Sequence, residues 1–434
     1  MDKMADVLGR AGAWCGQNKY LSAIKNAFQN FMPLTIAGAI GVLWFNVLVN
    51  DQTGLGLFFK PIMALDFLNP AFQAVNFCTI SCITVGITLG IAQEIGVWNM
   101  GAERAGYIPG LVGLAAWLSV TNTSHMVDGA KEAFTGVAGN ELGATGLFTG
   151  MIIGVLSVEL FCFFEKQDAL KIKMPEQVPP GVARAFEVLV PATITLIITA
   201  CIGSACYNLT GLYLNDVIKN GIQGPLGAVG ATIPGVMIIY LVIMLFWLVG
   251  IHGNNMLSAV KEALFTPLAL ENVEAFNKGE TPKNIINMYA LQMWGEFGGS
   301  GVTIGLVIAI MIFGKREDNK AIATLSLVPG LFNINETVTF GIPMVLNPIL
   351  GIPFVVAPLI TIIIGYVLTV IGFCPVACLT VPWTCPPIVF GFLACGANVM
   401  GAVTQAILIV VSTVIYVPFL ISYEKYQNKQ AAEA

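Results

Sequence analysis

A single carboxylate stands out in this sequence. Between Ala321 and Tyr423 the only charged side chain is Glu336. A carboxylate at membrane depth is costly, so it usually faces a polar interior and marks the path of a substrate, ion or proton. The neighbouring Asn333 and Asn335 supply amides and no cation. A carboxylate beside amides suits a sugar, whose hydroxyl groups donate to the carboxylate and accept from the amides.

A second polar group ends another uncharged run. His252 follows the tract 220–251 and is flanked by Gly250 and Gly253. These glycines predict that a helix opens here and presents the imidazole and the amide of Asn254 to a cavity. An imidazole and a carboxylate can share general acid–base work. The sequence therefore gives Glu336 and His252 as the candidate catalytic pair.

Two tryptophans are candidates for contact with a sugar. Sugar rings present C–H faces to aromatic side chains while their hydroxyl groups stay hydrogen-bonded. Trp247 lies five residues before His252, and Trp383 lies among prolines 382, 386 and 387. We find no phosphate-cradling loop, nucleophile elbow or metal-ligand spacing, so we expect no cofactor, no metal and no ATP-driven step.

The elements that position these residues are membrane helices. Of the 434 residues, 56% are hydrophobic and 10% are charged, with a net charge of −5, against roughly 25% charged in soluble domains. This composition excludes a soluble enzyme, a nucleic-acid binder and a disordered scaffold. The chain is predicted to be an all-α polytopic membrane protein in contact with membrane lipid. Apolar runs predict about ten spans, at 31–49, 73–96, 106–120, 144–164, 186–208, 231–251, 300–314, 351–372, 376–397 and 399–421.

The basic residues predict the orientation of the chain. The loop 165–184 carries four of them, and the positive-inside rule places it and the amino terminus in the cytoplasm. An even number of crossings also places the carboxyl terminus inside. One stretch leaves two possibilities open: either 253–299 contains a crossing or re-entrant hairpin, or the basic residues at 315–320 face outward. No signal peptide is expected.

Proline divides the chain into two parts of different character. Ten prolines fall between Pro329 and Pro418, including four that recur every five residues at 343, 348, 353 and 358. Proline interrupts helices, and broken helices build substrate sites in transporters. We therefore expect 211–434 to be a substrate-binding transport domain with re-entrant hairpins, and 1–210 to be a scaffold or dimerisation domain.

Three motifs carry a resemblance to a known family. The run Pro329–Pro358, which contains Asn-Ile-Asn-Glu336-Thr-Val-Thr-Phe-Gly-Ile-Pro, resembles the hallmark of the enzyme IIC sugar permeases of the bacterial phosphotransferase system. The match is to the lactose/cellobiose/diacetylchitobiose family. Gly250–Gly253 is similar to its second motif, and Lys25–Gly38 to its amino-terminal one. Thr337 departs from the pattern, because the family commonly has proline after the glutamate.

The resemblance implies a function and an assembly. It implies a homodimer of ten-helix protomers with re-entrant hairpins, in the bacterial cytoplasmic membrane. His252 and Glu336 match the family's essential histidine and glutamate, which contact a disaccharide, and Trp247, Trp383 and Asn140 match further sugar contacts. A separate phosphorylated enzyme IIB, charged by IIA, would phosphorylate the sugar during transport.

Two alternatives stay open at this point. A proton-coupled secondary sugar transporter could use Glu336 as its proton site, and an intramembrane enzyme could use Glu336 with His252 as an acid–base pair. The identity of the disaccharide is also open, because these motifs do not define the shape of the binding pocket.

Overall fold

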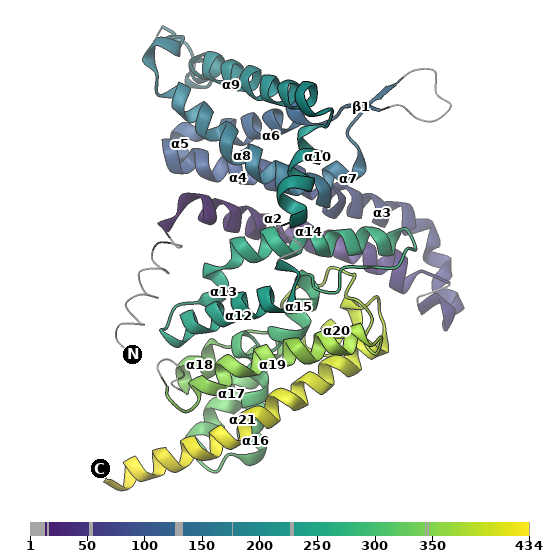
Figure 1. The fold of residues 1–434 in the computed structure, drawn as a ribbon, viewed down its shortest axis with the longest axis vertical. Coiled ribbons are helices and arrows are strands. Elements are labelled where there is room, and N and C mark those ends of the chain that lie inside the picture. The colour runs from purple at the N-terminus through teal and green to yellow at the C-terminus, as the bar shows by residue number, and fades with distance from the viewer. Residues whose placement is uncertain are drawn as a thin grey trace. The chain divides into compact units, whose positions relative to one another are not determined.

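The structure is a computed structural model that describes residue 14 and residues 17–51, 55–125, 133–175, 177–225, 230–342, 344 and 347–433. Most of this chain is helical, as the sequence predicts (Figure 1). It also contains one antiparallel pair of short strands, β1 (Ser124–His125) and β2 (Phe134–Thr135). The chain forms two compact units, which are described separately. We call them the amino-terminal unit (Gln17–Gly38 and Ala74–Ala228) and the carboxy-terminal unit (Met1–Gly16, Ala39–Gln73 and Val229–Ala434).

The amino-terminal unit is built mainly from four apolar helices. Its elements are the first part of α2 (Lys19–Leu43), the end of α3 (Asn69–Cys78), α4 (Ile83–Met100), α5 (Ala102–Ala105), α6 (Ile108–Val120), α7 (Gly139–Leu142), α8 (Ala144–Glu165), α9 (Pro180–Thr210) and α10 (Leu214–Ile218), with 3₁₀ or π turns at Ile80–Cys82, Asp168–Leu170 and Lys219–Gln223. Helices α4, α6, α8 and α9 pack against one another (Figure 1).

Small residues let these helices approach closely. A Cβ atom on Gly150 of α8 would lie 2.2 Å from Oγ1 of Thr88 on α4, and one on Gly86 would lie 2.2 Å from the ring of Phe31. Contacts this short have no room for a larger side chain. Gly86 and Gly150 therefore mark places where two helices pack closely.

A cluster of four charges joins helices α5, α8 and α9. The carboxylate of Glu165, which is 3% exposed, lies 2.7 Å from Nη2 of Arg104 and 3.0 Å from Nη1 of Arg184. The same two arginines contact Glu187, each at 2.9 Å. Alternating charges of this kind satisfy a carboxylate that has been taken out of water.

The carboxy-terminal unit contains more interrupted helices. After the turns at Trp44–Leu48, Leu55–Leu57 and Lys60–Leu68 come α12 (Ile233–Leu248), α13 (Gly253–Met256), α14 (Ser258–Asn277), α15 (Met288–Gly295), a turn at Ser300–Val302, α16 (Ile304–Phe313), α17 (Glu317–Leu331), α18 (Glu336–Gly341), α19 (Gly351–Val370), α20 (Val389–Ala394) and α21 (Val399–Glu433). Of the recurring prolines, Pro353 and Pro358 lie in α19 and Pro348 lies just before it, whereas Pro343 falls outside the described residues.

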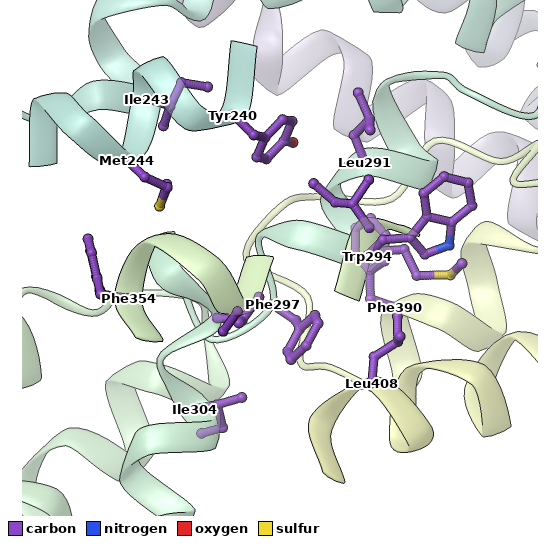
Figure 2. Close-up of a cluster of buried hydrophobic side chains, with 14 of the residues drawn as sticks. Tyr240, Ile243, Met244, Leu291, Trp294, Phe297, Ile304, Phe354, Phe390 and Leu408 are labelled. Atoms are coloured by element: carbon purple, nitrogen blue, oxygen red, sulfur yellow. The ribbon is translucent and has the colours of Figure 1, made fainter. Parts of the chain in front are cut away.

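Large apolar side chains from several of these helices fill the core of this unit. Figure 2 shows Tyr240 and Met244 of α12, Trp294 of α15, Phe354 of α19 and Leu408 of α21 in one buried cluster. Each of these side chains is at most 1% exposed. The core therefore holds together helix segments that are too short to be stable alone.

The described helices fit a membrane protein. Six of them are long and apolar enough to cross a bilayer, and the pair formed by α15 and α16, bent by 60°, could count as a seventh; α6 and α12 are shorter apolar helices. The span predicted at 376–397 is wrong as a helix, because only Val389–Ala394 is helical there. The four prolines at 375–387 prevent a regular helix over the first half of that stretch.

The long carboxy-terminal helix α21 is tied to the beginning of α17. Glu424 is 5% exposed, and its carboxylate accepts hydrogen bonds from the backbone N–H groups of Lys315 and Arg316 and from the amide of Asn319. A carboxylate at this position satisfies N–H groups around a helix start and opposes the positive end of the helix dipole.

Candidate functional site

A cavity of about 430 Å³ lies within the carboxy-terminal unit. It is lined by residues 252, 254 and 255 after α12, by parts of 292–300 around the end of α15 and by residues 333–336 around the start of α18. Trp383, Phe390 and Gln405 complete the lining. All of these segments lie at the ends of helices or between them. The cavity therefore collects the broken segments that the sequence predicts as a substrate site.

The structure brings His252 and Glu336 together on the wall of this cavity. Nε2 of His252 lies 3.8 Å from Oε1 of Glu336, and both side chains are partly exposed, by 37% and 47%. A hydroxyl oxygen can lie within hydrogen-bond distance of both atoms at once. The two groups are thus placed to bind one hydroxyl group of a ligand.

The hydrogen bond at the other ring nitrogen fixes the state of His252. Nδ1 accepts from the backbone N–H of Asn255 at 3.3 Å, which caps the short helix α13. An accepting Nδ1 leaves the proton on Nε2, on the side of Glu336. Burial lowers the pKa of His252 below its usual value of 6.5, and the negative charge of Glu336 offsets part of that effect. The imidazole is therefore neutral near pH 7.

Ser300 explains why two distant segments of the chain meet here. The amide of Asn254 donates to Oγ of Ser300 at 2.9 Å, and the amide of Asn335 donates to its backbone oxygen at 2.7 Å. Asn254 lies two residues from His252, and Asn335 lies next to Glu336. Asn254 and Asn335, which are among the predicted sugar ligands, thus also hold His252 and Glu336 close to each other.

A glycine-rich turn makes this arrangement possible. Gly298, Gly299 and Gly301 have φ angles of +70°, +88° and +78°, a region that side chains disfavour. A Cβ atom on Gly299 would lie 2.6 Å from the side chain of Asn335. Only glycine lets the turn approach Asn335 so closely.

Asn333 links three segments of the wall. Its side-chain oxygen accepts from the N–H of Gly298 at 2.6 Å, and its amide donates to the backbone oxygens of Trp383 and Cys385. Its own φ of +62° is tolerated by asparagine better than by most residues. The described contacts of Asn333 are therefore to backbone groups, and they fix Trp383 beside the carboxylate segment.

The predicted aromatic contacts lie in different places. Trp383 lines the cavity and is 44% exposed. Trp247 is buried, and its ring centroid lies 4.4 Å from that of His252, so it supports the imidazole from behind. Asn140 lies in α7 of the amino-terminal unit and is not among the residues that line this cavity; its role as a sugar contact stays a prediction.

The sequence reasoning missed Glu296, a second carboxylate in the cavity wall. Its Oε1 accepts from the hydroxyl of Tyr240 at 2.7 Å and forms an ion pair with Lys261. Glu296 is the only charged residue between Lys283 and Lys315. The reasoning that singled out Glu336, a lone carboxylate in a neutral tract, would have found it.

Unpaired acceptors also face this region. The side-chain oxygens of Asn254 and Gln292 are buried and have no hydrogen-bond partner among the described residues. Both residues line the cavity. Buried polar atoms are nearly always hydrogen-bonded, so these oxygens are suited to donors that a ligand brings.

The arrangement suits a neutral ligand that carries many hydroxyl groups. Two carboxylates and two free amide oxygens accept hydrogen bonds, Nε2 of His252 donates one, and Trp383 offers an aromatic face. Among the described residues no group of three histidine, cysteine or acidic side chains could hold a metal ion.

Comparison with known proteins agrees with this chemistry. The family described as "Phosphotransferase system, EIIC" matches residues 25–358. An oligo-beta-mannoside-specific EIIC component of Bacillus subtilis is 33% identical, over 98% of this chain and 94% of that protein. A cellobiose-specific EIIC component of Lactococcus lactis is 30% identical over 98% of both. The crystal structure of ChbC, the IIC component of an N,N'-diacetylchitobiose-specific phosphotransferase system, matches with a TM-score of 0.88 at 29% identity, over 97% of both chains.

Proposed function

This chain belongs to the EIIC family of phosphotransferase-system permeases, and we propose that it carries a neutral disaccharide of the cellobiose, lactose or diacetylchitobiose class across the bacterial cytoplasmic membrane. One observation carries the proposal: Nε2 of His252 and Oε1 of Glu336 lie 3.8 Å apart on the wall of a cavity of about 430 Å³. Cavities of roughly 300–1,000 Å³ hold small ligands. The sugars named for the relatives carry the hydroxyl groups that such a wall can bind.

EIIC components work with EIIA and EIIB components, and the chemistry of this site suits that partnership. A sugar hydroxyl held between His252 and Glu336 attacks the phosphoryl group carried on a cysteine of phosphorylated IIB. The hydroxyl proton passes to Oε1 of Glu336, the new P–O bond forms, and the P–S bond breaks with its electron pair returning to the IIB sulfur. Catalysis here is mainly positioning, with Glu336 as general base.

The two domains predicted from the sequence, whose bounds differ from those of the two compact units, have different roles in this proposal. Residues 211–434 form the substrate-binding transport domain with re-entrant hairpins, and 1–210 form the scaffold and the contact of a homodimer. Each protomer has ten spans with both termini in the cytoplasm. Six long apolar helices, two shorter ones and the bent pair α15–α16 give nine candidate spans among the described residues, one fewer than this count. The basic loop 165–184 supports the orientation.

Replacing Glu336 tests the proposal directly. We expect Glu336→Gln to abolish phosphorylation of the disaccharide, because glutamine cannot accept the hydroxyl proton, while the protein still folds. The measurement is formation of sugar phosphate by the protein in liposomes, supplied with phosphoenolpyruvate and the soluble phosphotransferase proteins. Glu317→Gln, an exposed carboxylate at the start of α17, is the matched control and should leave the rate unchanged. Sugar phosphate formed by Glu336→Gln at the unaltered rate would contradict the proposal.

A further inference from the structure

Glu296 has a feature that a purely structural ion pair does not need. Tyr240, which is fully buried, and Lys261, which is 6% exposed, both bind its Oε1. The other oxygen, Oε2, makes no hydrogen bond with any described residue, although the side chain lines the cavity. The carboxylate is thus anchored through one oxygen and leaves the other for a ligand.

Lys261 and Tyr240, which do not line the cavity, compensate the charge of Glu296. Lys261 comes from α14 and Tyr240 from α12, and Nζ of Lys261 also lies 5.6 Å from the centre of the Tyr240 ring. A buried ammonium group needs a partner of opposite charge. With that charge balanced, the free oxygen of Glu296 suits a neutral hydroxyl donor better than a cation.

Two further acceptors belong to residues that line the same cavity. Gln292 lies in the last turn of α15 and Glu296 directly follows that helix, and both residues line the cavity. The side-chain oxygen of Gln292 and that of Asn254 are buried and unpaired among the described residues. The three acceptors, Oε2 of Glu296 and the side-chain oxygens of Gln292 and Asn254, have no donor among the described residues. They indicate that this part of the cavity binds a ligand with several hydroxyl groups.

We propose that Glu296, Gln292 and Asn254 form a second hydroxyl-binding subsite of the cavity, and that Lys261 is a positioning residue that holds Glu296 in it. The subsite binds hydroxyl groups of the sugar other than the one that receives the phosphoryl group. This inference rests on the proposed function, since it takes the ligand to be a disaccharide. It adds a set of residues that determines affinity and sugar specificity without taking part in the transfer.

The test compares a charge-neutral pair of substitutions with the intact protein. Glu296→Gln with Lys261→Met removes both charges together, so neither is left buried without a partner. The measurement is calorimetric binding of cellobiose and of a set of analogues that each lack one hydroxyl group. We expect the double variant to bind cellobiose about 10- to 100-fold more weakly, as for a lost hydrogen bond to a charged group.

The analogues separate a direct contact from a general disturbance. For the intact protein, the analogue that lacks the hydroxyl bound by Glu296 should lose about 10-fold or more in affinity. In the double variant this analogue and cellobiose should bind equally, because the contact is already gone. Discrimination among all analogues that equals that of the intact protein would overturn the proposal.

Further variants make the outcome decisive. Glu274→Gln with Lys278→Met removes an exposed ion pair at the carboxyl end of α14, the helix that contains Lys261, and should leave binding unchanged. If the double variant at 296 and 261 does not fold, Glu296→Asp, which keeps the charge and retracts it by one methylene, takes its place with the same expected loss. Lys261→Met should reduce the discrimination between cellobiose and its analogues. Lys261→Arg should preserve it, because arginine keeps the positive charge that holds Glu296 in position.

The result also separates this inference from the proposed function. If the intact protein binds none of cellobiose, lactose and diacetylchitobiose, the proposed function fails and the subsite fails with it. If the intact protein binds one of them and the double variant binds it equally well, only the subsite is wrong. At saturating sugar, the double variant should still form sugar phosphate, whereas Glu336→Gln should not.

Discussion

At the scale of single residues, it was easier to predict which side chains take part in the site than to predict which residues surround them. The lone carboxylate Glu336 and the glycine-flanked His252 were recognisable from the sequence, and the structure places them 3.8 Å apart. The burial of Trp247 was not recognisable, because an aromatic side chain at a helix end packs inward or faces a cavity according to tertiary contacts. Glu296 carried the same signal as Glu336, and its partner Lys261 could not be assigned to it from sequence.

The state of His252 predicts how sugar binding depends on pH. Because burial lowers its pKa below 6.5, the neutral form and its hydrogen bond from Asn255 are fully present above that pH. They are lost as pH falls through the lowered pKa. We expect sugar affinity to hold at neutral pH and to fall at acidic pH, as His252 becomes protonated.

Calorimetric titration between about pH 5 and 8 checks this dependence. His125→Gln, which changes the other histidine of the chain, should leave the profile as it is. Affinity that increases on acidification would show that the charged imidazolium is the binding form.

At the scale of elements, the sequence predicted where helices are interrupted. It did not predict which of the interrupted segments lie next to one another in the fold. The prolines and glycines indicated interruptions near His252 and Glu336, and the structure confirms them, whereas the helix predicted across Trp383 is wrong. The contacts that join these breaks run from side chains to backbone, as from Asn333 to Trp383 and from Asn335 to Ser300. Such contacts leave no periodic pattern in a sequence, so they could not be predicted from it.

The glycine-rich turn gives a prediction at this scale. Gly299→Ala adds a Cβ atom at a φ of +88° and 2.6 Å from Asn335. We expect it to destabilise the protein by about 1–3 kcal/mol and to weaken sugar binding, because the turn and Glu336 shift together. Thermal unfolding and calorimetry measure the two effects. Gly181→Ala is the control, since a Cβ there meets nothing within 4 Å; equal effects of the two changes would show that the close approach is unimportant.

At the scale of the whole molecule, the amino-acid composition was sufficient to predict that the chain is a membrane protein. A chain with 10% charged residues belongs in a membrane, and the family match agrees. The two compact units were harder to predict, because the chain passes between them within α2 and α3. A helix that continues across such a boundary shows no change of composition there.

The two units predict two separable responses in thermal unfolding. Glu165→Gln removes the carboxylate that joins Arg104 to Arg184 in the amino-terminal unit, which should cost about 3–5 kcal/mol for a buried pair. Bound disaccharide should stabilise the carboxy-terminal unit, which contains the cavity. Calorimetric scans should show the substitution and the sugar acting on different transitions. A single transition that both shift alike would contradict this independence.

The continuous helix α21 has a mechanical consequence. Near the beginning of this helix, the side-chain oxygen of Gln405 accepts hydrogen bonds from the N–H groups of Ile388 and Gly391. Its amide donates to the backbone oxygen of Met293. Gln405 thus binds backbone groups close to the cavity that Trp383 lines. About 28 Å further along the same helix, the carboxylate of Glu424 accepts hydrogen bonds from the backbone just before α17. The other end of α17 is followed by Glu336. Because α21 is continuous between these two residues, a movement of its carboxyl end is transmitted through Gln405 to the backbone at Ile388, Gly391 and Met293 and through Glu424 to the helix that precedes Glu336.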